Sequence, residues 1–184
     1  MQQSLLSTAE AGAKSQTVEK SKALYSNAVR ELEKNNNSVV VSVGNQGKYL
    51  DYFAQDTNGA RVQSGAEAQH NVLVNPLVTT VGATIWEDSK TERIADYNSQ
   101  NPETDIYASG SVGNGLDLNR AKVRGTSFAA PRVAATLASL HGNHSGMPSS
   151  AMENLMKNRL THETEGELVL DFSAAEEYMR KGTF

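Results

Sequence analysis

Apolar residues recur at helical spacing from Thr17 to Lys34 and predict an amphipathic helix there. They are Val18, Leu24, Tyr25, Ala28, Val29 and Leu32. Glu19 lies in the first turn and Lys34 in the last, where their charges suit the helix dipole. Three asparagines, 35–37, then end the predicted helix.

In the next segment the helical spacing gives way to a run that is apolar except for Ser42. Val39–Val43 is rich in β-branched residues and predicts a buried parallel strand. The turn Gly44–Gly47 follows at its carboxyl end, where open α/β sheets place their ligands. Near the end of the chain, Leu168–Asp171 predicts a further short strand.

The heptapeptide Gly125–Pro131, Gly-Thr-Ser-Phe-Ala-Ala-Pro, precedes a small, apolar, helix-forming run over 132–140. A flexible glycine before a serine at a helix start lets the hydroxyl project into a cleft. The helix N-terminus offers unpaired N–H groups to a developing oxyanion. The alternative is that Thr126 or Ser127 is simply an N-cap residue.

Two capping-box patterns predict the last helices. Ser150–Glu153 begins a helix through about Arg159, and Ser173–Glu176 begins one that closes at Gly182. We expect these helices to serve packing alone.

Composition sets the class of protein. The 184 residues, 38% hydrophobic and 21% charged, predict a single globular domain over 1–184. The net charge of −4 and the absence of a basic cluster argue against a nucleic-acid partner. No apolar run approaches the ~20 residues that span a bilayer, so no membrane partner is expected. Without cysteine there is no disulfide framework.

The pattern G-T-S-x-A-x-P resembles the serine motif of the subtilisin-like serine proteases, the subtilases. The resemblance implies an α/β fold, a partial doubly wound subtilisin-like fold with a mostly parallel sheet and helices on both faces. It makes Ser127 the nucleophile, supported by Gly125 and Thr126. The chain then corresponds to the C-terminal portion of a subtilisin-like catalytic domain.

Val39–Gly47 looks like the family's strand that ends in a G-N-x-G turn. The resemblance implies that the Asn45 side-chain amide and the Ser127 N–H form an oxyanion hole. It also places Ser42, Val43 and Gly44 among the substrate-binding residues. Taken alone, the segment is better interpreted as an ordinary strand-end turn in which Asn45 tolerates a left-handed backbone.

Other segments extend the resemblance. Ser4, Leu5 and Leu6 sit where the family has a strand that pairs with the substrate backbone, although Leu6 and Ser7 replace two glycines. Three further segments, 75–83, 94–99 and 104–110, are similar to the next core strand, the "S-x-F-S" segment and the "D-x-x-A-P-G" strand. Tyr97 replaces the usual phenylalanine and Ser109 the usual proline. The polar stretch 48–75 is expected to be irregular and to border the pocket for the substrate side chain.

The family's aspartate and histidine motifs, D-[ST]-G and H-G-T, do not occur in the sequence. His141 begins a similar His-Gly pair, but it lies fourteen residues after Ser127 on the same predicted helix, about 20 Å away. A general base must come within about 3 Å. We therefore read His141 as a helix-end residue before a terminating Gly142. His70 and His162 have no partner pattern and are expected at the surface.

The sequence predicts no metal and no cofactor, because His141 and His144 lack cysteine or patterned acidic neighbours. Two functions remain. The chain is part of a serine endopeptidase acting on a polypeptide substrate, with the histidine and aspartate missing from it and the isolated chain inactive. Alternatively it is a non-catalytic interaction or regulatory module of the same fold. The expected partner is an N-terminal segment that supplies both residues, or a second copy bound through an exposed sheet edge.

Overall fold

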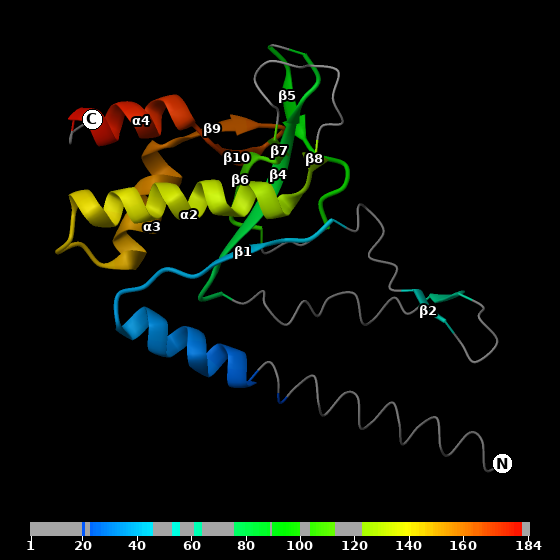
Figure 1. The fold of residues 1–184 in the computed structure, drawn as a ribbon, viewed down its shortest axis with the longest axis horizontal. Helices are drawn as coiled ribbons and strands as arrows, with labels where there is room; N and C mark the ends of the chain where they lie inside the picture. Colours follow the sequence, from blue (N-terminus) through cyan, green and yellow to red (C-terminus); the bar gives the residue numbers. More distant parts are fainter. Residues whose placement is uncertain are drawn as a thin grey trace.

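A computed structural model of the chain describes residues 20, 23–45, 53–55, 61–63, 76–88, 90–99, 104–112 and 123–181. Its main sheet contains β1 (Val40–Ser42), β4 (Thr79–Trp86), β5 (Glu92–Ile94), β6 (Ile106–Ser109), β9 (Thr161–Thr164) and β10 (Glu167–Leu170). The order is β1-β4-β6-β10-β9, with β5 paired to β4 (Figure 1). The pairs β1–β4, β4–β6 and β6–β10 are parallel, and β5 and β9 pair antiparallel.

Helices cover both faces of this sheet. Helices α2 (Thr126–Asn143), α3 (Ser149–Arg159) and α4 (Phe172–Lys181) share one core with β4, β6 and β10. The helix over residues 23–34 packs through Val29 against Val41 of β1, in a second core. Adjacent strand residues point to opposite faces, so Val40 joins the first core while Val41 joins the second. The expected α/β fold with a mostly parallel sheet and helices on both faces is confirmed.

The central strand β4 is buried along almost its whole length, as a strand covered on both faces must be. Val81, Ala83 and Thr84 are each 0% exposed. On the second face the Tyr107 ring lies over Gly82, where a Cβ would come within 2.3 Å of the ring. The parallel strand expected over 39–43 is confirmed as β1.

The first helix buries a narrower face than its sequence pattern indicates. Val29 is 1% exposed, whereas Leu24 is 72% and Leu32 is 44% exposed. Its end is as expected, because Asn36 adopts a left-handed conformation with φ of 60°. Among the described residues, no helix has the length and apolar character needed to cross a membrane.

Both capping-box predictions are wrong in their details. Helix α3 begins at Ser149 after Pro148, and the Ser149 N–H donates to the Asn36 side-chain oxygen at 2.5 Å. Helix α4 begins at Phe172, and Asp171 accepts the Ala174 N–H at 3.0 Å. The side chains that bind N–H groups at these two helix starts are therefore Asn36 and Asp171, and not Ser150 and Ser173.

Two hairpins lie where the sequence suggested none. Strands β2 (Phe53–Gln55) and β3 (Arg61–Gln63) pair inside the stretch 48–75, which is therefore not wholly irregular. Strands β9 and β10 join through Glu165 and Gly166, both with positive φ, as a two-residue type I′ turn requires. Strands β7 (Ser111–Val112) and β8 (Val123–Arg124) form a third small pair that leads into α2.

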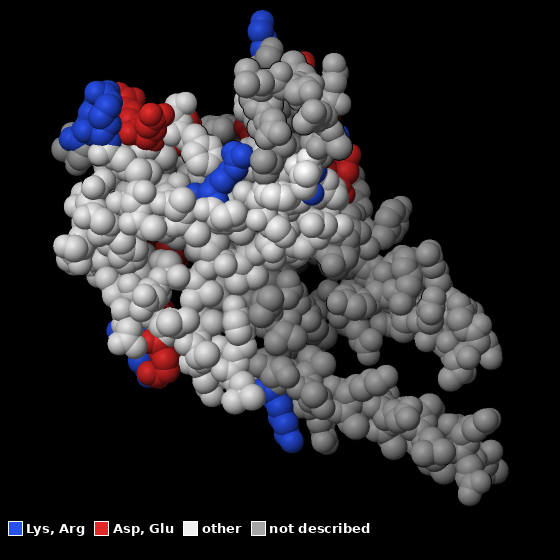
Figure 2. All heavy atoms as spheres, in the orientation of Figure 1, with Lys and Arg blue, Asp and Glu red and all other residues white. Residues whose placement is uncertain are grey.

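Charged side chains are scattered over the described surface. On the face shown in Figure 2, basic and acidic groups lie in small neighbouring clusters separated by uncharged surface. One cluster includes Lys181 beside Glu177 on α4. Such pairs at the surface contribute little to stability.

Candidate active site

The site is built on the contact between the end of β1 and the start of α2. The Asn45 side-chain oxygen accepts the Thr126 backbone N–H at 2.8 Å and the Thr126 hydroxyl at 3.0 Å. Thr126 is 1% exposed, and the next residue, Ser127, is exposed. The structure therefore brings together Asn45, Gly125, Thr126 and Ser127, as the sequence pattern implied.

Helix α2 begins at Thr126, and its N-cap is Gly125 with no side-chain cap. Neither Thr126 nor Ser127 is the N-cap residue, so the simple capping alternative does not describe this turn. The Thr126 and Ser127 N–H groups belong to the first turn, whose N–H groups have no acceptor within the helix. Pro131 has no N–H, so the Ser127 carbonyl also lacks its usual partner four residues on.

Gly125 allows Asn45 to lie close to the helix start. A Cβ at Gly125 would come within 3.1 Å of the Asn45 amide nitrogen. With its oxygen held by Thr126, the Asn45 carboxamide presents its N–H donors from a fixed plane. Of the N–H groups at the start of α2, that of Thr126 is bound to Asn45 and that of Phe128 donates to the Gly125 carbonyl at 3.0 Å, with the Ser127 N–H between them.

The turn before Asn45 has a defined backbone. Gly44 has a φ of 104°, a left-handed conformation that glycine adopts without a Cβ clash. Asn45 itself is not among the described non-glycine residues with positive φ, so Gly44 provides the left-handed residue of this turn. Ser42, Val43 and Gly44 lead directly to Asn45, whereas Ser4, Leu5 and Leu6 lie outside the described residues.

The described histidines have other surroundings. His141 is in the last turn of the unbroken α2, at the opposite end from Ser127, and α2 continues one residue beyond Gly142. His144 contacts the Tyr178 hydroxyl at 2.7 Å. His162 pairs with Glu92 at 3.0 Å, a partner that the sequence pattern had not indicated. His70 lies outside the described residues.

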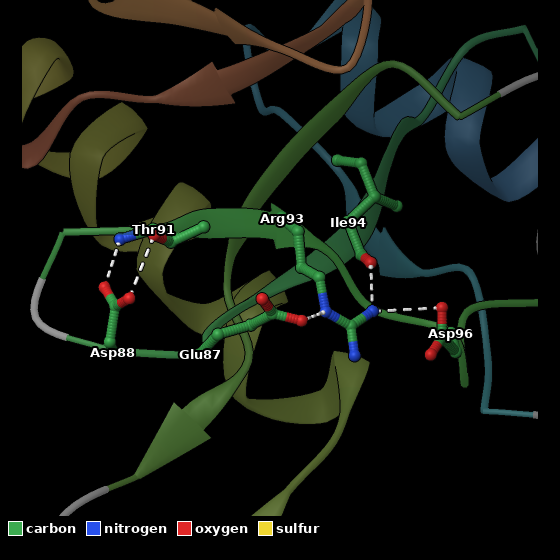
Figure 3. A network of polar contacts seen from close by, with 6 residues as sticks. All are labelled: Glu87, Asp88, Thr91, Arg93, Ile94 and Asp96. Atoms are coloured by element: carbon green, nitrogen blue, oxygen red, sulfur yellow. Dashed lines mark hydrogen bonds and ion pairs between the residues drawn. The ribbon is translucent and has the colours of Figure 1, made fainter.

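A polar network organises the connection that leads from β4 through β5 toward the site (Figure 3). Arg93 pairs with Glu87 at 2.5 Å and with Asp96 at 3.0 Å. At the hairpin tip, Asp88 accepts the backbone N–H groups of Lys90 and Thr91, both at 2.7 Å. These hydrogen bonds to the charged carboxylate lower the pKa of Asp88.

Tyr97 lies close to the site, next to Gly110, a contact that the sequence analysis did not expect. A Cβ at Gly110 would lie 2.5 Å from the Tyr97 hydroxyl and 3.1 Å from the Gly125 carbonyl oxygen. Burial raises the pKa of Tyr97, against the opposing effects of the Arg124 charge and the Gly125 backbone. The only sequence signal was that Tyr97 stands where the resemblance has phenylalanine.

Metal-binding side chains do not gather in the described part of the chain. No group of three or more histidine, cysteine, aspartate or glutamate side chains there could hold an ion.

Comparison with known proteins identifies the family of the chain. The model of the subtilase family, Peptidase S8, matches residues 6–174. The solved structure of subtilase cytotoxin SubAB is similar with a TM-score of 0.55 and 17% identity, covering 87% of this chain and 54% of that chain. No curated protein sequence matches the chain.

Two further structures show the same fold. For proteases from Pseudoalteromonas arctica the TM-score is 0.54 with 18% identity, covering 83% of this chain and 46% of that chain. For a lanthipeptide protease the TM-score is 0.53 with 21% identity, covering 86% of this chain and 55% of that chain. The chain spans about half the length of these structures. By its match to the family model over most of its length, the chain belongs to the subtilase family.

Proposed function

We propose that this chain carries the nucleophile and the oxyanion hole of a subtilisin-like serine endopeptidase. The observation that supports this best is the hydrogen bond from the Thr126 N–H to the Asn45 side-chain oxygen, 2.8 Å long. It fixes an amide donor beside Ser127, which is exposed at the start of α2. Packing alone gives no reason to hold an exposed asparagine next to an exposed serine.

In the proposed reaction the Ser127 Oγ attacks the carbonyl carbon of a peptide bond while a base removes its proton. The carbonyl oxygen becomes negatively charged and receives hydrogen bonds from the Asn45 amide and the Ser127 N–H. The bond to the leaving amine then breaks as that nitrogen takes the proton. Water hydrolyses the acyl-enzyme and releases Ser127.

The base and its orienting carboxylate come from outside this sequence in the proposal. The described histidines are paired elsewhere or lie at the far end of α2. An N-terminal segment of the same protein, or another chain, supplies the histidine and aspartate. The substrate is a polypeptide that lies along Ser42, Val43 and Gly44, with Ser4, Leu5 and Leu6 as a further substrate strand.

A fluorophosphonate probe tests this proposal, because it reacts with serines that a base has activated. We expect the isolated chain to stay unlabelled by intact-mass analysis, since loss of the base costs on the order of a millionfold in turnover. With a segment carrying D-[ST]-G and H-G-T motifs added, labelling should appear and should be absent in Ser127→Ala. Labelling of Ser127 in the isolated chain would contradict the missing base.

The role of Asn45 is tested in the complemented protein. Asn45→Ala should lower kcat by about 10²–10³-fold, the usual cost of removing one oxyanion donor. Asn143→Ala, at the opposite end of α2, is the matched control and should leave kcat unchanged. If Asn45→Ala has no effect on kcat, Asn45 does not bind the oxyanion.

The second candidate is a non-catalytic interaction module. Strand β1 lies at the end of the described sheet order, so one of its edges has no described partner strand. Either this edge binds an N-terminal segment, or it binds a second copy of the chain. If the complemented protein remains unlabelled by the fluorophosphonate, the interaction module becomes the better proposal.

A further inference from the structure

Three consecutive residues between β5 and β6, Tyr97–Ser99, contact both sides of the candidate site. One end of this segment reaches the turn before Asn45. The Ser99 N–H donates to the Gly44 carbonyl at 3.0 Å. Because Gly44 immediately precedes Asn45, this bond limits how far Asn45 can move away from the sheet.

The middle of the segment is anchored to the core. The Asn98 side chain is 8% exposed and makes two hydrogen bonds with the backbone of Ala83. Its oxygen accepts the Ala83 N–H at 2.7 Å, and its nitrogen donates to the Ala83 carbonyl at 2.8 Å. Ala83 is 0% exposed in β4, so Asn98 is hydrogen-bonded to the buried central strand.

The other end of the segment, Tyr97, lies near the turn that starts α2. The Tyr97 hydroxyl is buried and packs against Gly110, which in turn accepts the Gly125 N–H at 2.9 Å. Gly110 is bound to β4 as well, through its N–H to the Thr84 carbonyl at 2.9 Å. Movement of Tyr97 would therefore move Gly110 and Gly125, just before Ser127.

We propose that Tyr97, Asn98 and Ser99 act as a brace that sets the spacing between Asn45 and Ser127. Tyr97 and Asn98 are positioning residues, since neither reaches the position of the reacting atoms. The relevance of these residues to catalysis rests on the proposed function. The effect of the brace on the spacing between Asn45 and Ser127 does not depend on that function. The pair between Arg93 and Asp96, 3.0 Å long, fixes the residue just before the brace (Figure 3).

Amide hydrogen exchange of the full chain tests the brace without requiring activity. The Thr126 N–H is bonded to Asn45, so its exchange rate reports whether the two sides of the site stay together. Asn98→Ala should speed Thr126 exchange by about fivefold or more, as expected for loss of one hydrogen bond or more. Tyr97→Phe should give a smaller acceleration in the same amide.

Two comparisons separate positioning from general stability. The Ala175 N–H, bonded to Asp171 at 2.9 Å in α4, should exchange at an unchanged rate in both variants. Tyr107→Phe removes the hydroxyl of a buried tyrosine elsewhere in the sheet and should leave Thr126 unaffected. Asn45→Ala is the positive control and should accelerate Thr126 most.

Equal acceleration of Thr126 and Ala175 in Asn98→Ala would overturn the brace, because it would show only a less stable fold. An unchanged Thr126 rate in Asn98→Ala would overturn it as well. In the complemented protein the brace variants should lower kcat and leave KM unchanged. If the exchange result holds while no variant of the protein ever reacts with a fluorophosphonate, the brace stands and the proposed function fails.

Discussion

Asn45 and Thr126 are 81 residues apart in the chain, and the carboxamide oxygen of one accepts two hydrogen bonds from the other. The contact joins the carboxyl end of β1 to the amino end of α2. Both hydrogen bonds use the asparagine oxygen, so the amide nitrogen is the group that the proposed oxyanion role would use.

The Thr126 hydroxyl contributes to this contact, and its removal should weaken it. Thr126→Val keeps the side-chain shape but loses the 3.0 Å hydrogen bond to Asn45. We expect the free energy of unfolding to fall by about 1 kcal/mol in urea denaturation, the typical cost of one such bond. Thr136→Val is the matched control, because its hydroxyl bonds only the Arg132 carbonyl of the same helix. An equal fall in the free energy of unfolding in Thr136→Val would show that the effect of Thr126→Val does not come from the hydrogen bond to Asn45.

Asp88 should give the β4–β5 hairpin a pH dependence. Its pKa is lowered in the folded state by the N–H groups of Lys90 and Thr91. A carboxylate with a lowered pKa stabilises the fold above its unfolded pKa, and that contribution is lost as the pH falls through the folded value. We therefore expect the Thr91 amide to be less protected from exchange, relative to an unfolded chain at the same pH, below about pH 4. In Asp88→Asn this acid-induced change should be absent, and its persistence would point to another group.

Strands of the main sheet could be predicted where the sequence is mostly apolar over several residues. Val39–Val43 became β1, and Leu168–Asp171 became β10 with its bounds shifted by one residue. Such runs are informative because a strand covered on both faces tolerates few polar side chains. The narrower burial of the first helix was not predictable, because only β1 and its neighbours determine that Val29, and not Leu24, faces the core.

The helix caps show why local patterns failed. The Ser149 N–H is bound by Asn36, which lies 113 residues earlier in the chain. A capping box considers only side chains within four residues, so it could not include this acceptor. The same limit applies to Tyr97 and Gly110, whose contact depends on how β5 turns back beside β4. From the sequence, Asn45 and Ser127 could be assigned to the candidate site only because they match motifs of the family.

The shared core of α2 and α3 should account for much of the stability. Leu140 is 0% exposed and belongs to the cluster that contains Met152 and Met156 of α3. Leu140→Ala should lower the free energy of unfolding by about 2–5 kcal/mol, through lost burial and the cavity that remains. Leu24→Ala is the matched control, since Leu24 is 72% exposed, and it should change stability by less than about 0.5 kcal/mol. Equal losses would mean that Leu24 is buried in solution.

The outer edge of β1 should determine the association state of the isolated chain. The Val39 carbonyl and the Val43 N–H bond to β4, so the alternating backbone groups of Val40 and Ser42 point to the opposite edge. Such an edge invites pairing with another chain. We expect a dimer by light scattering, and Ser42→Pro should convert it to a monomer, because proline removes an outward N–H without touching the bonds to β4. Thr161→Pro, on the opposite edge strand β9, is the control and should remain dimeric. A monomeric isolated chain would show that β1 does not pair with a second copy, and a dimer that persists in Ser42→Pro would place the interface elsewhere.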